Sequence, residues 1–519
     1  MNTKKALPKY VRVCLGATFL LGVLAHGMAL VNKFCLADEA ARMFTVGSTV
    51  ASGRWFLGVI GGFVRWFFGS PNFSLPLTGG LLTILLTGLC SCVLVSWMGL
   101  KKKISWILIS GLMITFPIMP CLFFYHFTAP YYMAGLLLIF LGGSILCRNR
   151  NIQAFVCGVV LVCLGLSIYQ AFVSLFLSLL LIFFFREVTE QNEWTASKLL
   201  REILWFCGAC VVIALMYLLS VKISNFLNHT ELLDYKGISS MGSTSISDYV
   251  GRIKLALYLY LFPNKSDRYA FLFPYRLANC YFLVIVCSAL LISWTALRQR
   301  KTPLKMVTIL LVLAFFPFAS NFIYIACDAS DIYTLVLFGQ LAPFLLLVCL
   351  ADWLLPSALY RSDWKKLIET VPVLLLSVFC LYSVRVDNAV YTEAQFAQTR
   401  SQAYFSGIVT QVKSTPGYTA NSHVAFVGNP FSATNAVFRR IDGFAQISIS
   451  PLTYSDNPFC VSYYGWQEYI SLWCGFSPIY EDGAKYAELP EVQAMPDYPD
   501  NGSIKMINDV VVVKLNDEN

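Results

Sequence analysis

The stretch "VRVCLGATFLLGVLAHGMALV" (residues 11–31) decides the fold class, because it has the length and apolar character of one helical membrane crossing. Similar runs recur as far as residue 387. Of the 519 residues, 57% are hydrophobic and only 13% are charged, against about 25% charged residues in typical soluble domains. The first run has no small-residue cleavage pattern at its end, so we expect it to be retained rather than removed as a signal peptide. The sequence therefore predicts a polytopic α-helical membrane protein.

Short clusters of lysine and arginine lie between the apolar runs, and such clusters favour the cytoplasmic side. The cluster within residues 4–12 therefore places the N-terminus in the cytoplasm. The 35 uncharged residues between Arg150 and Arg186 suit either one overlong helix or a hairpin. A hairpin that turns near residues 167–170 keeps every later basic cluster inside, so we predict the hairpin. This choice gives about eleven crossings and leaves the C-terminus outside the cell.

The remaining crossings and two surface helices follow from the same hydropathy pattern. A second crossing is expected near residues 75–97. The seventh to eleventh crossings are expected near residues 203–221, 279–297, 306–326, 332–350 and 367–382. Residues 37–56 and 246–262 mix apolar and polar positions, which is typical of amphipathic helices on the membrane surface.

The composition changes near residue 388. From there to residue 519, charged residues, Asn, Gly, Pro and Tyr become frequent, and no 18-residue apolar run occurs. We therefore expect a transmembrane domain over residues 1–387 and a small extracytoplasmic α/β domain over residues 388–519. The segments "HVAFVG" (423–428) and "DVVVVKL" (509–515) predict strands in this second domain.

Several classes of function are disfavoured by the sequence. It has no Walker loop, no G-x-G-x-x-G after a strand, no H-E-x-x-H and no G-x-S-x-G motif. Four histidines make a multi-histidine metal site improbable, and most of the seventeen cysteines lie in apolar runs. The topology accounts for the net charge of +9, so no nucleic-acid partner is expected. We expect no cofactor, and the need for a divalent cation is left open.

An acidic pair, Asp38 and Glu39, follows the first crossing directly, and Arg42, Arg54 and Trp55 come shortly after it. A carboxylate at the level of the lipid head groups can accept a proton from a sugar hydroxyl. Arg42 or Arg54 can hold the phosphate of a lipid-linked sugar as it leaves. Asp38 and Arg42 are four residues apart, so the simpler alternative is an ion pair on a helix surface.

Several motifs together resemble those of GtrII-type glucosyltransferases, a family in the GT-C class of membrane glycosyltransferases. The resemblance rests on "DE" (38–39), "GRW" (53–55), "FPIMPCLFFY" (116–125), "SIYQAF" (167–172) and a soluble tail. Many relatives carry two aspartates where this chain has Asp38 followed by Glu39. Both positions keep a carboxylate, so which of the two acts is left open.

The resemblance implies an inverting transferase. It would move a hexose, often glucose, from a polyprenyl-phosphate carrier to a cell-surface polysaccharide, as in O-antigen modification. Asp38 or Glu39 would act as the general base on the acceptor hydroxyl. The implied partners are the lipid-linked donor, the glycan acceptor and membrane lipid, with a flippase and a donor-synthesising synthase in the same pathway.

Other residues of the outer face are weaker candidates for substrate binding. The candidates are His126, Tyr131, Asp248, Arg252, Lys254 and Arg276. Each has a simpler alternative role, as an interfacial aromatic residue or as part of an ordinary amphipathic face. Asp328 and Asp331 can bind a cation together with Asp38, although solvated turn residues are the commoner case.

Two rival functions fit a similar composition. A transporter or flippase of lipid-linked sugars also needs many helices, but transporters tend to show two related halves and charges near mid-bilayer. Here the charges gather at one face and the expected crossing count is odd. A non-catalytic assembly protein, whose tail binds wall polymer, would leave Asp38 and Glu39 replaceable.

Overall fold

The computed structural model describes residues 7–35, 38–232, 245–263, 272–329, 332–355, 363–430, 444 and 465–516. Two compact units share the chain. The first consists chiefly of Met1–Lys33 and Phe44–Ala389, and the second chiefly of Phe34–Met43, Val390–Ala445 and Pro451–Asn519. The acidic pair after the first crossing thus belongs to the second unit.

Eight of the described helices are long and apolar enough to cross a membrane. They are α1 (Lys9–Val31), α3 (Pro76–Trp97), α6 (Ala129–Arg148), α8 (Val173–Glu190, preceded by η2 at Gln170–Phe172), α9 (Ala196–Leu227), α11 (Tyr275–Arg298), α12 (Pro303–Ser320) and α15 (Asp363–Ser414). Shorter apolar helices include α4 (Lys103–Thr115), α7 (Ile152–Leu166) and α14 (Ala342–Leu354). The chain is therefore a polytopic helical membrane protein, and the count of eleven crossings stays a prediction.

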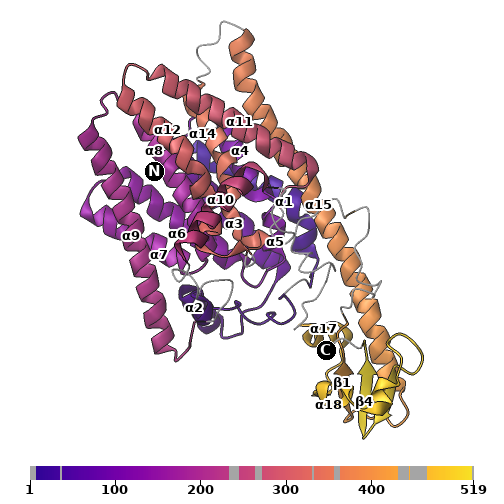
Figure 1. Cartoon of the computed structure of the whole chain (residues 1–519). Helices are drawn as coiled ribbons and strands as arrows, with labels where there is room; N and C mark the ends of the chain where they lie inside the picture. Colours follow the sequence, from indigo (N-terminus) through magenta and orange to yellow (C-terminus); the bar gives the residue numbers. More distant parts are fainter. Residues whose placement is uncertain are drawn as a thin grey trace, which may run out of the picture. The chain divides into compact units, whose positions relative to one another are not determined.

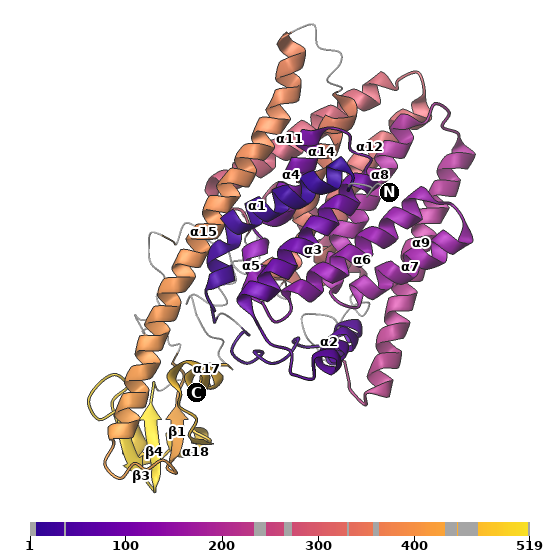
Figure 2. The ribbon, with the colours of Figure 1, turned by 180° about the vertical axis from the view of Figure 1, so that it is seen from behind.

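The first unit is a layered bundle in which neighbouring helices run side by side (Figures 1 and 2). Helix α1 packs on α3 and α4, α3 on α6, α6 on α7, and α7 on α9. On the other side, α8 packs on α12, and α11 packs on α12 and α14. Short turns join most of these helices, so consecutive helices alternate in direction.

The basic clusters meet at one end of the first unit, here called the basic end, where α3, α6, α8 and α14 finish and α4, α9 and α12 start. The Asp352 carboxylate accepts the backbone N–H groups of Lys101 at 3.1 Å and Lys102 at 2.9 Å. Lys305 Nζ donates to the Gln191 carbonyl, and Arg148 Nη2 donates to Ser96 Oγ at 3.1 Å. The opposite end, where α1 and α7 finish and α3, α6 and η2 start, is here called the aromatic end.

The predicted hairpin between Arg150 and Arg186 is confirmed, since α7 ends at Leu166 and α8 starts at Val173. Helix α7 also lies very close to α6. A Cβ atom built on Gly165 would lie 2.5 Å from the Gly135 carbonyl oxygen, and one on Gly142 would lie 2.7 Å from that of Gly158. Small residues at both contacts let the two backbones touch, as in many membrane helix pairs.

The predicted surface helix over residues 37–56 is wrong. Residues 38–44 form turns, a short 3-10 helix η1 covers Val50–Ser52, and an unexpected helix α2 covers Trp55–Phe68. Gly47 has φ +92° and Gly53 has φ +73°, left-handed conformations that interrupt a helix. The helix predicted over residues 246–262 is confirmed as α10 (Ile246–Leu261), and its place on the membrane surface stays a prediction.

Three later boundaries differ from the sequence expectation. Helix α12 stops at Ser320 and is followed by the separate short helix α13 (Phe322–Ala326). The expected helix over 332–350 begins only at Ala342, after two 3-10 turns, η6 (Thr334–Val336) and η7 (Phe338–Leu341). Helix α15 continues to Ser414, so the expected domain boundary at residue 388 falls inside a helix.

The second unit contains a four-stranded sheet in the order β2-β1-β4-β3. Strand β1 (His423–Val427) runs parallel to β2 (Ile479–Glu481) and β4 (Val510–Lys514), and β3 (Ile504–Ile507) runs antiparallel to β4. The strands predicted near 423–428 and 509–515 are thus confirmed. The short helices of this unit are α17 (Trp466–Cys474), α18 (Ala484–Ala487) and α19 (Pro490–Gln493).

Candidate functional site

Arg54, the central residue of the "GRW" motif, lies against two tyrosines at the aromatic end of the first unit. Its Nη1 donates to Tyr132 Oη at 2.8 Å. Its Cζ lies 5.8 Å from the ring centroid of Tyr132 and 5.3 Å from that of Tyr169. The two rings stack with centroids 4.0 Å apart. A charged hydrogen bond and two aromatic faces therefore fix this guanidinium. Arg54, Tyr132 and Tyr169 are called the arginine–tyrosine cluster below.

The other two residues of the motif attach it to α9. Gly53 has φ +73°, and its carbonyl accepts a hydrogen bond from Tyr217 Oη at 3.3 Å. A Cβ atom on Gly53 would lie 2.8 Å from that same hydroxyl, so only glycine fits without a shift. Trp55 Nε1 donates to Ser220 Oγ at 3.0 Å.

The "GRW" motif also interlocks with the "SIYQAF" motif, more than a hundred residues further along the chain. Gln170 Nε2 donates to the Ser52 carbonyl at 3.0 Å. The Phe56 backbone N–H donates to the Ser167 carbonyl at 3.2 Å. The turn between α7 and α8 therefore holds the backbone on both sides of Arg54.

Tyr169 is the most enclosed member of the cluster, with 1% of its surface exposed. Its hydroxyl donates to the Leu335 carbonyl at 3.1 Å. Burial, with smaller contributions from Tyr333 and Tyr132, raises the pKa of Tyr169 well above its ordinary value, and Arg54 offsets this only partly. Tyr169 therefore stays a neutral hydrogen-bond donor at physiological pH.

The acidic pair predicted to be catalytic lies in the second unit. Asp38 is half-buried and Glu39 is fully buried. The Arg42 backbone N–H donates to the Asp38 carbonyl at 2.9 Å, which closes one turn of chain around the pair. Just before the pair, the Cys35 backbone N–H donates to Gln398 Oε1 of α15 at 2.8 Å. The acidic segment is thus fastened to the polar part of α15.

Two aromatic-end candidates, His126 and Tyr131, have separate environments. Tyr131 Oη donates to Asn72 Oδ1 at 3.2 Å, and Asn72 Nδ2 in turn donates to the Gly61 carbonyl at 3.0 Å, so Tyr131 helps to hold α2. His126 is 2% exposed. Burial, assisted by the charge of Lys33, lowers the pKa of His126 to about 3, so this ring is neutral at pH 7.

Helix α10 carries three of the candidates, Asp248, Arg252 and Lys254. Asp248 is exposed, and its backbone N–H donates to Ser245 Oγ at 3.2 Å while Ser245 Oγ donates to Asp248 Oδ2 at 2.6 Å, a cap of the helix start. Arg252 Nη2 lies 3.7 Å from Asp328 Oδ2, and its Nη1 donates to the Ala326 carbonyl at 3.4 Å. Arg252 therefore joins α10 to the chain after α13.

The remaining candidates contribute no shared site. Lys254 and Arg276 are exposed, and Asp331 lies outside the described residues. No group of three or more His, Cys, Asp or Glu side chains within the described ranges is arranged to hold a metal ion.

Three functional candidates were missed from the sequence: Tyr132, Tyr169 and Tyr217. Tyr169 stands inside the "SIYQAF" motif (167–172), and Tyr132 follows the candidate Tyr131, seven residues after the "FPIMPCLFFY" motif (116–125). Nothing in the linear pattern showed that these two rings would contact Arg54.

These features define a polytopic membrane protein with a partly buried arginine at one end of its helical bundle. The family model for glucosyl transferase GtrII matches residues 27–344, which include both the "GRW" and the "SIYQAF" motifs. The chain belongs to the GtrII glucosyltransferase family, which supports glycosyl transfer as its chemistry. No curated protein matches the chain significantly.

Proposed function

We propose that this protein transfers a hexose, with glucose expected, from a polyprenyl-phosphate carrier to a cell-surface polysaccharide on the outer face of the membrane. The observation that carries the proposal is the family match over residues 27–344, which contains the acidic pair and the arginine–tyrosine cluster. Eight apolar helices agree with a lipid-borne donor, because such a donor reaches the enzyme through the bilayer.

The proposed reaction is a direct displacement with inversion. The acceptor hydroxyl oxygen attacks C1 of the hexose, and the bond between C1 and the phosphate oxygen breaks. The hydroxyl proton passes to the carboxylate of Asp38 or Glu39, acting as general base. The carrier leaves as polyprenyl phosphate, whose charge Arg42 or Arg54 stabilises. Atoms and charge balance without a metal or nucleotide.

The proposed topology has eleven crossings, with the basic end in the cytoplasm and both the aromatic end and residues 388–519 outside. The positive-inside bias supports this orientation. Counting α4, α7 and α14 with the eight longer helices gives this number, with the fourth shorter apolar helix, α2, taken not to cross.

A transporter of lipid-linked sugar is the alternative function. Its mechanism would need polar groups exposed along a path through the bundle. The arginine–tyrosine cluster lies instead at one end of the first unit, which favours chemistry at a membrane face.

The test measures transfer of labelled glucose from polyprenyl-phosphoglucose in membranes that contain Asp38→Asn, Glu39→Gln or both substitutions. The matched controls are Asp500→Asn and Glu491→Gln, exposed carboxylates of the second unit. We expect the double variant and one of the two single variants to lose glucose transfer although they are expressed normally. Both controls should keep their activity.

Full activity in the double variant would exclude the general-base assignment. Movement of labelled lipid across vesicles without sugar on the acceptor would instead support the transporter. Comparing the surface polysaccharide of a deletion strain with that of its parent identifies the sugar and the acceptor, since the transferase predicts loss of a side-branch hexose.

A further inference from the structure

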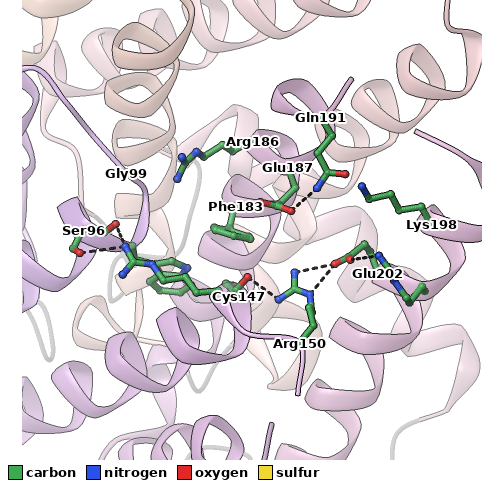
Figure 3. Close-up of a pocket in the computed structure, with 13 residues that line it drawn as sticks. Ser96, Gly99, Cys147, Arg150, Phe183, Arg186, Glu187, Gln191, Lys198 and Glu202 are labelled. Atoms are coloured by element: carbon green, nitrogen blue, oxygen red, sulfur yellow. Dashed lines mark hydrogen bonds and ion pairs between the residues drawn. The ribbon is translucent and has the colours of Figure 1, made fainter. Parts of the chain in front are cut away.

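A polar cavity of about 480 Å³ opens at the basic end, far along the helices from the arginine–tyrosine cluster. It lies between the ends of α3, α6 and α8 and the start of α9 (Figure 3). Five basic side chains and two carboxylates, Glu187 and Glu202, line it, which leaves an excess of three positive charges. The aromatic rings of Trp97 and Phe183 form part of its wall. The cavity is therefore suited to an anion.

Some of the charged side chains that line the cavity bind one another and so hold its wall together. Arg150 donates from Nε and Nη2 to Glu202 Oε2, at 3.2 and 2.8 Å, and from Nη1 to the carbonyls of Leu146 and Cys147. Glu187 Oε2 accepts from Gln191 Nε2 at 2.8 Å. Both carboxylates thus have partners within the wall, as the dashed lines in Figure 3 mark.

Other basic groups keep donors for a ligand. Lys198 makes no ion pair or hydrogen bond with the described residues through Nζ, which lies 6.0 Å from the Trp194 ring centroid. The Arg201 side chain is 70% exposed. Its Nη2 lies 3.8 Å from Glu202 Oε1, too far for a hydrogen bond. Figure 3 shows Lys198 and Arg186 on opposite sides of Glu187, so their charges face the cavity from two helices.

The wall behind Arg186 is shaped for its guanidinium group. A Cβ atom on Gly99, which has φ +62°, would lie 2.5 Å from Arg186 Nη1. Arg186 Nε donates to Glu190 Oε1 at 2.9 Å, and its Cζ lies 5.9 Å from the Trp353 ring centroid. Arg186 is therefore held in place before any ligand arrives, which lowers the entropy cost of binding.

A second, mainly apolar groove of about 560 Å³ begins at the same arginine, Arg201. It runs between α7 and α9 along Phe155, Leu204 and Gly208. Helix α9 is apolar yet mostly exposed, with Leu204 63% exposed. A basic cavity that continues into an apolar groove on the membrane-facing side of a helix matches a charged head group followed by an acyl chain.

We propose that the basic cavity and the α7–α9 groove bind an anionic glycerophospholipid of the surrounding leaflet. Its phosphate would contact Lys198, Arg201 and Arg186, and one acyl chain would lie over Gly208. Arginine and lysine both recognise phosphate, arginine through paired N–H donors. The site is separate from the proposed catalytic residues, so the proposal does not depend on the acceptor or the sugar.

The test uses the purified full-length protein in a neutral detergent and follows its thermal unfolding as phosphatidylglycerol is added, with native mass spectrometry of the bound lipid. We expect phosphatidylglycerol to raise the Tm and phosphatidylcholine to leave it unchanged, because only the anionic lipid complements the cavity. The Lys198→Gln/Arg201→Gln variant should bind about tenfold more weakly. The matched control is Lys222→Gln/Arg65→Gln, which removes two exposed charges at the aromatic end and should keep the full Tm shift.

A second variant tests the groove without touching the charges. A Cβ atom on Gly208 meets no other atom within 4 Å, so Gly208→Leu should fold and fill the groove, and it should reduce the lipid-induced Tm shift. Gly16→Leu on α1, which is equally open, is its control.

An equal Tm shift in the Lys198→Gln/Arg201→Gln variant, or an equal shift with phosphatidylcholine, would overturn the proposal. If inorganic phosphate alone reproduces the shift, or if polyprenyl phosphate displaces phosphatidylglycerol at equal concentration, the assignment to a glycerophospholipid is overturned.

Discussion

Gly53 and Tyr217 meet so closely that the glycine carbonyl accepts the tyrosine hydroxyl at 3.3 Å, while a side chain on the glycine would collide with that hydroxyl. This contact connects the loop that carries Arg54 to α9. The position of Arg54 therefore depends on a backbone that only glycine adopts easily.

We expect Gly53→Ala to destabilise the protein by about 1–2 kcal/mol from its left-handed backbone alone, with the collision adding to this cost. A thermal unfolding measurement in detergent should show a lower Tm. Gly62→Ala is the control, because Gly62 lies inside α2 with open space around it. Its Tm should stay the same or rise, since alanine favours the helix. An unchanged Tm in Gly53→Ala would contradict the close contact.

Arg54→Lys tests whether the planar guanidinium is needed. Lysine keeps the charge but loses the planar group that donates to Tyr132 and lies against the Tyr169 ring. A hydrogen bond to a charged group contributes about 1.5–3 kcal/mol, so glucose transfer should fall about ten- to a hundredfold. Arg65→Lys, on the exposed side of α2, should keep its activity. Equal rates in the two variants would remove Arg54 from the site.

His126 should make stability depend on pH. Its folded pKa, about 3, lies below the ordinary value of 6.5, so between these values the unfolded chain binds a proton that the folded chain does not. Stability therefore falls as the pH drops from about 6.5 towards 3. Replacing His126 by Gln should reduce the loss of Tm between pH 7 and pH 5. His229→Gln, at an exposed position after α9, should leave that loss unchanged.

Two buried aspartates of the first unit should respond in opposite ways to the same isosteric change. Asp352 accepts two backbone N–H groups, whereas neither carboxylate oxygen of Asp387, which is fully buried in α15, has a hydrogen-bond partner among the residues that the structure describes. Asp352→Asn should lower the Tm, because one N–H group loses its acceptor at a cost of about 1–3 kcal/mol. Asp387→Asn should keep or raise the Tm, because it removes an uncompensated buried acid. A large loss in Asp387→Asn would show that this side chain has a partner under the conditions of the assay.

The hydropathy pattern located most membrane helices, and charge placement correctly predicted the α7–α8 hairpin, because crossing a bilayer imposes strict length and charge rules. The pattern failed for residues 37–56, where apolar residues recur with helical spacing but two glycines adopt positive φ. The pattern also predicted that the last crossing helix ends near residue 382, whereas α15 is longer. Beyond residue 382 the chain becomes polar, yet it has no proline between Pro372 and Pro416, so the helix continues to Ser414.

The candidate site was predicted only in part. Arg54 was recognised as a phosphate-binding candidate, while its tyrosine partners were not, because their contact depends on how α6 and the α7–α8 turn pack together. Single residues can be read from a motif, but contacts between motifs a hundred residues apart require the fold. The roles of Asp38, Glu39 and Arg42 stay predictions.

The glycine contacts between α6 and α7 have a mechanical consequence. Each helix has its two contact glycines seven residues apart, Gly135 and Gly142 on one and Gly158 and Gly165 on the other, so both backbones touch at two heights. Sliding one helix by a single residue would shift it by about 1.5 Å and push side chains into those contacts. Tyr132 stands near the start of α6 and Tyr169 just past the end of α7. The glycine contacts that fix the register of these two helices therefore also fix the spacing of the two rings beside Arg54.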